Sequence, residues 1–461
     1  MDYKDVIEKI WSTPELGFEE FESSKVLIDY MNENEFKTTV GIAGMKTAFV
    51  SEYGSGKPII SFLAEYDALS GMNQEADNEV YKPITKAEDN GHGCGHHLLG
   101  AGACLAAILY KDYLKNNNLS GTVKMYGCPG EESGSGKAFL ARDGYFKNDD
   151  IALTWHPSNL NKVSSGSSLS CIQVYFRFYG VSSHAAGAPH LGRSALDAVE
   201  LMNVGVNYMR EHMESTDRVH YAITNTGGES PNVVQAFAEV RYFIRSTDNY
   251  KVQKLYERVC NIAKGAALMT ECRQETIFFE GLSNLVPNFK LEGVLDEVFK
   301  NIKMPKYSTN ELSYLQKFKD SYDIKSFINQ NFDYVVDKDK LLNNIEESPI
   351  NDYYIECKSY EKSDMGSTDV GDTSWIVPTA QINTACFSYG AGGHTYQWVA
   401  QGKSDPAKKA VKLAAEVLCN TAIKLHSNPK IIEEAKEEFN ERTKSGYLCL
   451  IPLNAKPENI K

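Results

Sequence analysis

Short apolar segments that alternate with a helical pattern dominate the first 160 residues of the chain. Residues 59–64, 122–127 and 151–155 are typical of buried strands, and residues 97–114 carry the periodic apolar positions of a long amphipathic helix. Strands that alternate with helices favour parallel pairing, because each crossover places a helix on a face of the sheet. We therefore predict an α/β fold with an open, mostly parallel sheet and helices on both faces.

A different pattern begins near residue 169. Polar and apolar residues alternate over 172–178, as in a half-buried strand, and the segments that follow indicate helix, strand, strand, helix and strand. This order is typical of the split βαβ, or ferredoxin-like, unit. The expected segments are a helix over 192–212, strands over 219–224 and 233–244, a helix over 250–266 and a strand over 270–280.

The first pattern then returns. An apolar strand is expected over 382–389, followed by a helix that begins at Ser404 as N-cap, with Pro406 in its first turn. The simplest arrangement is an α/β domain interrupted by a compact insert. We predict that the α/β domain occupies residues 1–165 and 285–461 and that the ferredoxin-like insert occupies residues 166–284.

Charge and cysteine content limit the classes of function. The chain has 461 residues, with 48 Lys and Arg against 61 Asp and Glu, and a formal net charge of −13. This acidity opposes binding to nucleic acid and to anionic membrane surfaces. No apolar run approaches the roughly 20 residues of a membrane span. The charged N-terminus does not resemble a signal peptide. The ten cysteines lack the paired spacing of a disulfide scaffold. We expect a soluble cytoplasmic protein that binds neither nucleic acid nor membranes.

Carboxylate, thiol and imidazole side chains follow the predicted strands. Taken singly, each has a structural alternative, such as a helix cap, a solvated acid pair or a hydrogen-bonded histidine. Because the carboxyl ends of parallel strands meet at one edge of a sheet, the groups together favour a single cleft with one or two divalent ions. The residues are Asp67, Cys94, His96, Glu131, Glu132, His156 and His394.

The segment EESGSGKA at residues 131–138 invites comparison with a phosphate-binding loop. It lacks the first glycine and the final Ser or Thr of that motif, which are Glu131 and Ala138 in this chain. Two carboxylates at the mouth of such a loop would also repel phosphate. We therefore reject a nucleotide site at this segment.

These motifs resemble the amidohydrolase branch of metallopeptidase family 20, the relatives of carboxypeptidase G and aminoacylase, over nearly the whole chain. Cys94-Gly95-His96 is similar to the Cys-Gly-His metal motif of that branch, and Glu131-Glu132 is similar to its acid pair. The usual His-x-Asp start of the family is Glu65-Tyr66-Asp67 here, so the first histidine ligand is missing. The segments that resemble hydrolases of p-aminobenzoyl-glutamate are 126–132, 152–157 and 366–372.

The resemblance implies a pair of divalent ions, Zn²⁺ or Mn²⁺, in the α/β domain. Glu131 is then the general base, which takes a proton from the attacking water and later donates it to the leaving amine. Asp67 orients a ligand or adjusts its basicity. A thiolate ligand suits Zn²⁺, whereas some relatives use Mn²⁺, and the division of ligands between the two ions stays open. The implied ligands are Cys94, His96, Glu132, His156 and His394.

The resemblance also identifies the insert as a lid and dimerisation domain. By analogy, His184 reaches the active site of the neighbouring subunit and stabilises the developing oxyanion, and Asn232 matches the lid asparagine. Arg245 binds the substrate carboxylate with its guanidinium fork, unless Arg241 on the same face of the strand does so. We expect a homodimer, with a heteromer that contains a homologous subunit as the alternative.

The leading interpretation is a metal-dependent amidohydrolase that cleaves an amide bond of an N-acyl or N-aroyl amino acid such as p-aminobenzoyl-glutamate. A dipeptidase or an N-acyl-amino-acid deacylase on the same site is the alternative among enzymes. A non-catalytic partner subunit is the alternative outside enzymes. The presence of Glu131 disfavours it, because a pure binder needs no general base beside a full ligand set.

Overall fold

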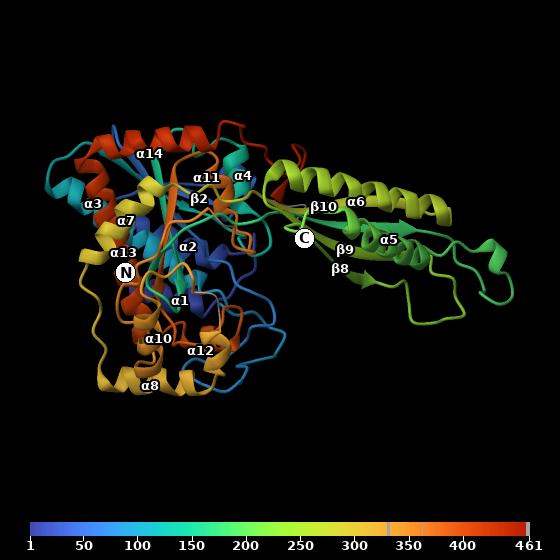
Figure 1. Cartoon of the computed structure of the whole chain (residues 1–461), viewed down its shortest axis with the longest axis horizontal. Helices are drawn as coiled ribbons and strands as arrows, with labels where there is room; N and C mark the ends of the chain where they lie inside the picture. The colour runs from blue at the N-terminus through green and yellow to red at the C-terminus, as the bar shows by residue number, and fades with distance from the viewer. Residues whose placement is uncertain (330–331, 362, 458–461) are drawn as a thin grey trace. The chain divides into compact units, whose positions relative to one another are not determined.

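The chain folds into two compact units in a computed structural model that describes residues 1–329, 332–361 and 363–457 (Figure 1). Each unit has its own sheet and its own hydrophobic core. Within those ranges, no helix is both long enough and apolar enough to cross a membrane. Unit 1 comprises Met1–Ser167, Val286–Lys362 and Thr373–Tyr447, and unit 2 comprises Ser168–Leu285, Ser363–Asp372 and the chain from Leu448.

The sheet of unit 1 contains seven strands. They are β1 (Lys37–Val40), β2 (Phe49–Ser55), β3 (Ile59–Ala64), β4 (Gly121–Gly127), β5 (Ile151–Ser158), β6 (Lys162–Ser164) and β11 (Thr379–Ala385). In the sheet order β1-β2-β4-β3-β5-β11-β6, the four strands from β4 to β11 pair in parallel, and β2 and β6 flank them antiparallel. Because β1 is antiparallel to β2, five of the seven strands run in one direction. The predicted mostly parallel sheet is confirmed.

Long helices cover one face of this sheet. Phe62 of β3 lies in the core together with apolar side chains of α3 (His96–Asn116) and α13 (Asp405–Ser427). α3 comes very close to β5, because a Cβ at Gly102 would lie only 2.6 Å from the ring of Trp155. This close packing holds the N-terminal half of α3 against the sheet.

The segment that follows β4 covers the opposite face. Phe146 stacks edge-on against Tyr126 at 4.8 Å between ring centroids, and the Tyr126 hydroxyl donates to the carbonyl of Tyr145 at 2.9 Å. The predicted α/β fold is confirmed. The other helices are α1 (Tyr3–Trp11), α2 (Phe21–Glu33), α4 (Gly136–Arg142), α7 (Phe289–Asn301), α8 (Thr309–Asp320), α9 (Ile324–Ile328), α10 (Lys338–Glu347), α11 (Val370–Ser374), α12 (Tyr396–Gln401) and α14 (Pro429–Arg442).

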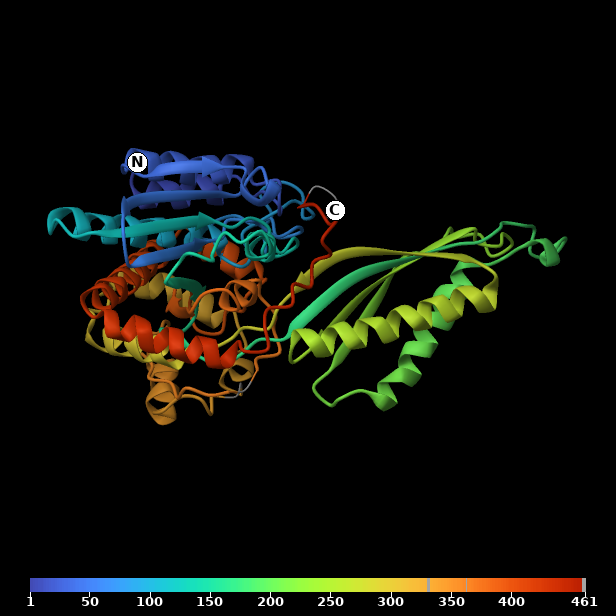
Figure 2. The same cartoon turned by 90° about the horizontal axis from the view of Figure 1, so that it is seen from above.

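Unit 2 has the strand-helix-strand-strand-helix-strand order expected from the sequence. Its elements are β7 (Ser170–Tyr179), α5 (Ala195–Met209), β8 (Arg218–Asn225), β9 (Phe237–Ser246), α6 (Asn249–Thr270) and β10 (Arg273–Leu282). The strands form an antiparallel sheet in the order β10-β7-β9-β8, and α5 and α6 lie along one face of it (Figure 2). This is the topology of the split βαβ unit.

Two segments that were expected in the α/β domain pack with unit 2 instead. The carboxylate of Asp372 accepts hydrogen bonds from the backbone N–H and the hydroxyl of Ser283, at 3.0 and 2.6 Å. The carbonyl of Leu448 accepts a hydrogen bond of 2.8 Å from the Asn249 side chain. These polar contacts join distant parts of the chain, and no pattern of hydrophobic residues reveals them.

Candidate metal centre

The carboxyl ends of the parallel strands meet at one edge of the unit 1 sheet. Asp67 follows β3, Glu131 and Glu132 follow β4, and His156 lies near the end of β5. His394 lies in the glycine-rich segment that follows β11. Strand direction therefore gathers residues that are far apart in the sequence, as it does at the ligand sites of other open α/β sheets.

Cys94 and His96 reach the same place from the start of α3. Gly95, between them, has a φ of 82°, in the left-handed region. Its missing side chain also leaves room for Pro157, because a Cβ would lie 3.1 Å from that ring. This glycine lets the chain turn sharply into the helix, so that the Cys94 sulfur and a His96 ring nitrogen share one cluster of potential ligand atoms.

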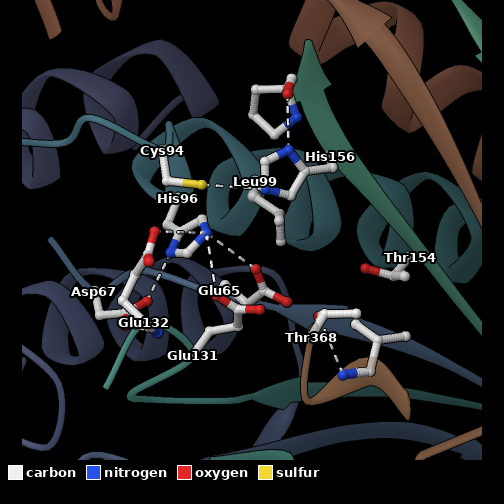
Figure 3. Close-up of polar contacts among 12 residues, drawn as sticks. Glu65, Asp67, Cys94, His96, Leu99, Glu131, Glu132, Thr154, His156 and Thr368 are labelled. Atoms are coloured by element: carbon white, nitrogen blue, oxygen red, sulfur yellow. Dashed lines mark hydrogen bonds and ion pairs between the residues drawn. The ribbon is translucent and has the colours of Figure 1, made fainter. Parts of the chain in front are cut away.

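The His96 ring is surrounded by acidic side chains (Figure 3). Its Nδ1 donates a 2.7 Å hydrogen bond to Oδ1 of Asp67. Its buried Nε2 has no hydrogen-bond partner within the part of the chain that the structure describes. Carboxylate oxygens nevertheless lie 3.3 Å (Glu65), 3.9 Å (Glu132) and 4.0 Å (Glu131) from Nε2.

The charge state of His96 follows from these neighbours. Burial opposes protonation of the ring, but the acidic groups around it raise its pKa well above the ordinary value. The environment of Nε2 therefore favours a positive charge, and a proton or a metal ion can supply it.

Cys94 and His156 form a second part of the cluster. The sulfur lies 3.4 Å from Nε2 of His156, whose Nδ1 donates to the Pro157 carbonyl at 2.7 Å, so that Nε2 faces the sulfur. Burial raises the pKa of the Cys94 thiol, and burial together with the nearby His96 charge lowers the pKa of His156. A thiol with a raised pKa is a poor free nucleophile, but it loses its proton when it coordinates a metal. The pair therefore suits metal binding.

Glu132 and His394 form the third part. Nε2 of His394 lies 3.3 Å from Oε1 of Glu132. Burial opposes ionisation of Glu132, but the contact with His394 and the charge of His96 outweigh it and lower the pKa of the carboxyl to about 2. The same contact raises the pKa of His394. The backbone N–H of His394 donates to the Gly93 carbonyl at 2.9 Å, which ties the segment after β11 to the segment before α3.

The donor atoms have the spacing of metal ligands. Within each of three groups, all donor atoms lie within 4.8 Å of one another. Thiolate, imidazole and carboxylate are donors that Zn²⁺ accepts, and an ion would satisfy the orphaned Nε2 of His96. The residues present therefore fit a centre of divalent ions. The groups are Cys94 with His96 and His156, Cys94 with Glu132 and His394, and Glu65 with His96 and Glu131.

Glu65 belongs to this cluster, although the sequence marked it only as the replacement of a histidine. Its side chain is 3% exposed. It directly follows β3, two residues before Asp67. The position just after a strand, which made Asp67 a candidate site residue, therefore makes Glu65 a candidate as well.

The expected lid residues His184 and Asn232 lie in unit 2. Nδ1 of His184 accepts hydrogen bonds from the N–H groups of Ala186 and Gly187 at 3.2 and 3.0 Å. The exposed ring therefore presents Nε2 as a donor. Asn232 is adjacent, since its carbonyl accepts from the N–H of Ala185 at 3.0 Å.

The two expected arginines share one face of β9. Arg241 lies 4.0 Å above the ring of Phe279 and donates to the side-chain oxygen of Gln173 at 2.6 Å. Arg245 lies 4.0 Å above Phe243 and donates from Nη1 to the Met365 carbonyl at 3.0 Å, and its Nε has no hydrogen-bond partner among the residues that the structure covers. Both guanidinium groups therefore have an acceptor in the protein, and the buried Nε without a partner makes Arg245 the better candidate for binding a carboxylate.

Sequence comparisons agree with these features. Residues 62–424 match the profile of peptidase family M20/M25/M40. One of the subunits of p-aminobenzoyl-glutamate hydrolase from Escherichia coli (strain K12) is 41% identical to this chain, over 100% of the chain and 96% of that protein. The Xaa-Arg dipeptidase of Mus musculus is 27% identical, over 93% of this chain and 87% of that protein.

The fold is also found among solved structures. The aminobenzoyl-glutamate utilization protein from Klebsiella pneumoniae matches with a TM-score of 0.60 and 14% identity, over 92% of this chain and 95% of that chain. At this identity the likeness concerns the fold. The family profile covers most of the chain and the 41% identity extends over all of it, so the family resemblance is confirmed. The chain belongs to peptidase family M20/M25/M40.

Proposed function

We propose that this chain is a metal-dependent amidohydrolase that cleaves an amide bond of an N-acyl or N-aroyl amino acid, with p-aminobenzoyl-glutamate as the first candidate. The observation that carries the proposal is the position of Glu131, a carboxylate outside the implied ligand set, 4.0 Å from Nε2 of His96. Family membership supports metal-dependent hydrolysis. The identity to a p-aminobenzoyl-glutamate hydrolase subunit supports the substrate class.

Two divalent ions match the two donor groups that share Cys94. When bound, the ions would lower the pKa of a water molecule and polarise the amide carbonyl. The thiolate favours Zn²⁺, and the carboxylate oxygen is equally compatible with Mn²⁺. The proposed ligands are Cys94, His96, Glu132, His156 and His394.

Glu131 acts as the proton carrier in this proposal. Its carboxylate takes a proton from the attacking water, holds it, and returns it to the nitrogen of the leaving amine. Only 14% of its side chain is exposed, which limits exchange of that proton with bulk water. Asp67 supports this step, because it holds the His96 ring and also accepts a 2.8 Å hydrogen bond from the N–H of Glu132. It thereby positions the segment that carries the general base.

The insert, residues 166–284, is proposed as the lid and dimerisation domain. The donor that His184 presents is suited to stabilising the oxyanion of the tetrahedral intermediate in the neighbouring subunit's site. Asn232 would bind the substrate beside it, and the Arg245 guanidinium would bind the substrate carboxylate. A homodimer is the smallest assembly with these properties. The Escherichia coli relative is named as a subunit, so a heteromer with a homologous chain is the second candidate assembly.

A hydrolysis assay tests the function. Purified protein loaded with Zn²⁺ or Mn²⁺ is offered p-aminobenzoyl-glutamate, other N-acyl amino acids and a dipeptide panel that includes Xaa-Arg dipeptides, because of the likeness to that dipeptidase. We expect release of p-aminobenzoate and little from a Glu131→Gln variant. Cleavage of dipeptides alone would favour the dipeptidase alternative. Failure of the metal-loaded chain to cleave any of these amides would contradict the proposal.

A further inference from the structure

A buried lysine lies beside the candidate metal centre. Lys137, in the first turn of α4, has a side chain that is 0% exposed, and its Nζ lies 2.6 Å from Oε1 of Glu65. An ammonium and a carboxylate are both costly to bury unless they are paired. Lys137 belongs to the segment 131–138, which lacks the pattern of a nucleotide site and gives the lysine no other evident role.

The second carboxylate oxygen of Glu65 points at the cluster. Oε2 lies 3.3 Å from Nε2 of His96, closer than the oxygens of Glu131 and Glu132. Because Nδ1 of His96 is committed to Asp67, this contact brings two potential ligand atoms together in a fully buried place. Two such atoms oppose each other unless a positive charge lies next to both.

The distance itself has the value expected for two ligands of one ion. Nitrogen and oxygen ligands lie about 2.0–2.1 Å from Zn²⁺ in tetrahedral sites, so two of them on one ion are about 3.3–3.4 Å apart. The 3.3 Å between Glu65 and His96 matches this spacing, and so does the 3.3 Å between Glu132 and His394. The contacts of Glu131 and Glu132 with His96, at 4.0 and 3.9 Å, are longer.

We propose that Glu65 is an oxygen ligand of the ion that His96 binds, and that Lys137 is the positioning residue that holds Glu65 in the ligand orientation. The proposal rests on the metal centre of the proposed function and adds a ligand to it. Lys137 engages Oε1, so that Oε2, which lies beside Nε2 of His96, would be left to bind the ion. Its ammonium also balances one of the negative charges that the centre collects.

A purely structural ion pair is the alternative. In that case the removal of both charges together is tolerated, because buried ion pairs are often replaceable by neutral side chains of similar volume. A ligand role predicts that the same double replacement restores the fold but not the affinity for the ion. The double variant therefore separates the two cases.

The test compares Glu65→Gln, Lys137→Met and the double variant with the wild type. Lys111→Met is the matched control, because Lys111 is a buried lysine of unit 1 with a side chain 5% exposed, paired with Asp112 at 2.7 Å. Affinity for Zn²⁺ is measured by competition with a chelator, ions per chain after dialysis, and coordination from the absorption spectrum of the Co²⁺-loaded protein. Circular dichroism verifies the fold.

We expect Glu65→Gln and the double variant to bind one ion at least about tenfold more weakly, with an altered Co²⁺ spectrum. Lys137→Met should weaken the same ion, and Lys111→Met should leave both ions unchanged. A folded Glu65→Gln or double variant with wild-type affinity and spectrum would overturn the proposal. If Lys137→Met does not fold, the double variant decides.

Hydrolysis of p-aminobenzoyl-glutamate by the metal-loaded wild type is measured on the same preparation. An inactive wild type that binds two ions contradicts the proposed function and leaves the ligand assignment standing. An active wild type beside a Glu65→Gln variant with unchanged metal binding contradicts only the assignment of Glu65.

Discussion

Asp67 holds the ring of His96 through a 2.7 Å hydrogen bond between Oδ1 and Nδ1, and both side chains are fully buried. Oδ2 of the same carboxylate accepts the backbone N–H of Glu132 at 2.8 Å. One acidic residue therefore sets the orientation of an imidazole and the position of the acid pair that follows β4. An amide in its place offers a single acceptor oxygen for two donors.

Asp67→Asn should therefore weaken metal binding by about 10–100-fold without unfolding unit 1, which is the usual effect of losing the residue that orients a ligand. Chelator competition measures the affinity. Asp149→Asn is the control, since Asp149 is also buried in unit 1 but pairs with Lys124 at 2.9 Å. Equal affinities for Asp67→Asn and wild type would show that His96 does not depend on this contact.

Glu131→Gln should retain both ions and lower kcat by at least about 10²-fold, because the variant cannot accept or return a proton. Glu132→Gln is the informative control. It should lose metal, since Glu132 belongs to a donor group with Cys94 and His394. Metal analysis and steady-state kinetics distinguish the two. A Glu131→Gln variant within a few-fold of the wild type would remove this residue from the mechanism.

Cys94→Ala should lower the metal content and also flatten its dependence on pH. Burial raises the pKa of the Cys94 thiol, so the wild type must release a proton from it when the ion binds, and affinity falls as the pH falls. The Cys94→Ala variant has no such proton to release, so its metal affinity should change about tenfold less per pH unit than that of the wild type. Chelator competition between pH 6 and 8 measures the slope. Cys104→Ala, a buried cysteine further along α3, should keep the wild-type slope.

Glu292 should make unit 1 less stable as the pH rises. Burial raises the pKa of this carboxyl on α7 to about 7, so the folded state binds its proton more tightly than the unfolded state does. Stability is then fully present below about pH 4.5 and is lost as the pH rises through 7. Relative to the wild type, Glu292→Gln should gain on the order of 2–3 kcal/mol in free energy of unfolding between pH 4.5 and 8.

Urea unfolding at the two pH values measures this difference. Glu297→Gln is the control on the same helix, because its side chain is 65% exposed. A wild type and a Glu292→Gln variant with parallel pH dependence would show that the Glu292 proton is not held on folding.

A mixing experiment tests whether His184 acts in the neighbouring subunit. His184→Ala and Glu131→Gln chains should each be nearly inactive alone and should regain activity after subunit exchange. At equal mixing about half of the dimers are heterodimers with one intact site, so about a quarter of wild-type activity is the ceiling. A mixture of Glu131→Gln and Glu132→Gln should not recover, because both residues belong to one site. No recovery with His184→Ala, despite proven exchange, would place His184 in its own chain's site or in structure alone.

Hydrophobic periodicity predicted the strands and helices around the candidate metal centre more accurately than it predicted the outer strands of the sheet. β3 has the expected bounds, and Ser404 caps α13 as expected, accepting from the N–H of Ala407. The strands β1, β2 and β6 were not predicted, because β1 and β6 are short edge strands and β2 is only partly buried. β11 ends at Ala385, four residues before the apolar run does, since Cys386–Tyr389 is buried without strand pairing. Apolar character alone cannot separate these cases.

The cluster around His96 was likewise predicted only in part. Strand exits predicted that Glu132, His156 and His394 would meet, because that follows from strand direction. The pairing of Glu65 with Lys137 could not be predicted, since it depends on how α4 packs after the turn that follows the acid pair. A lysine in a glycine-rich segment gives no indication of its partner.

Strand β11 is synthesised long after the two strands with which it pairs. It pairs with β5 on one side and with β6 on the other. In the sequence, however, the whole sheet of unit 2 lies between β6 and β11. At about 5–20 residues per second, a ribosome reaches β11 on the order of tens of seconds after β5. Until then β5 has an unpaired edge and His394 has not been made. The candidate metal centre is thus one of the last features to be completed during synthesis, and a chaperone that shields an open sheet edge would act within that interval.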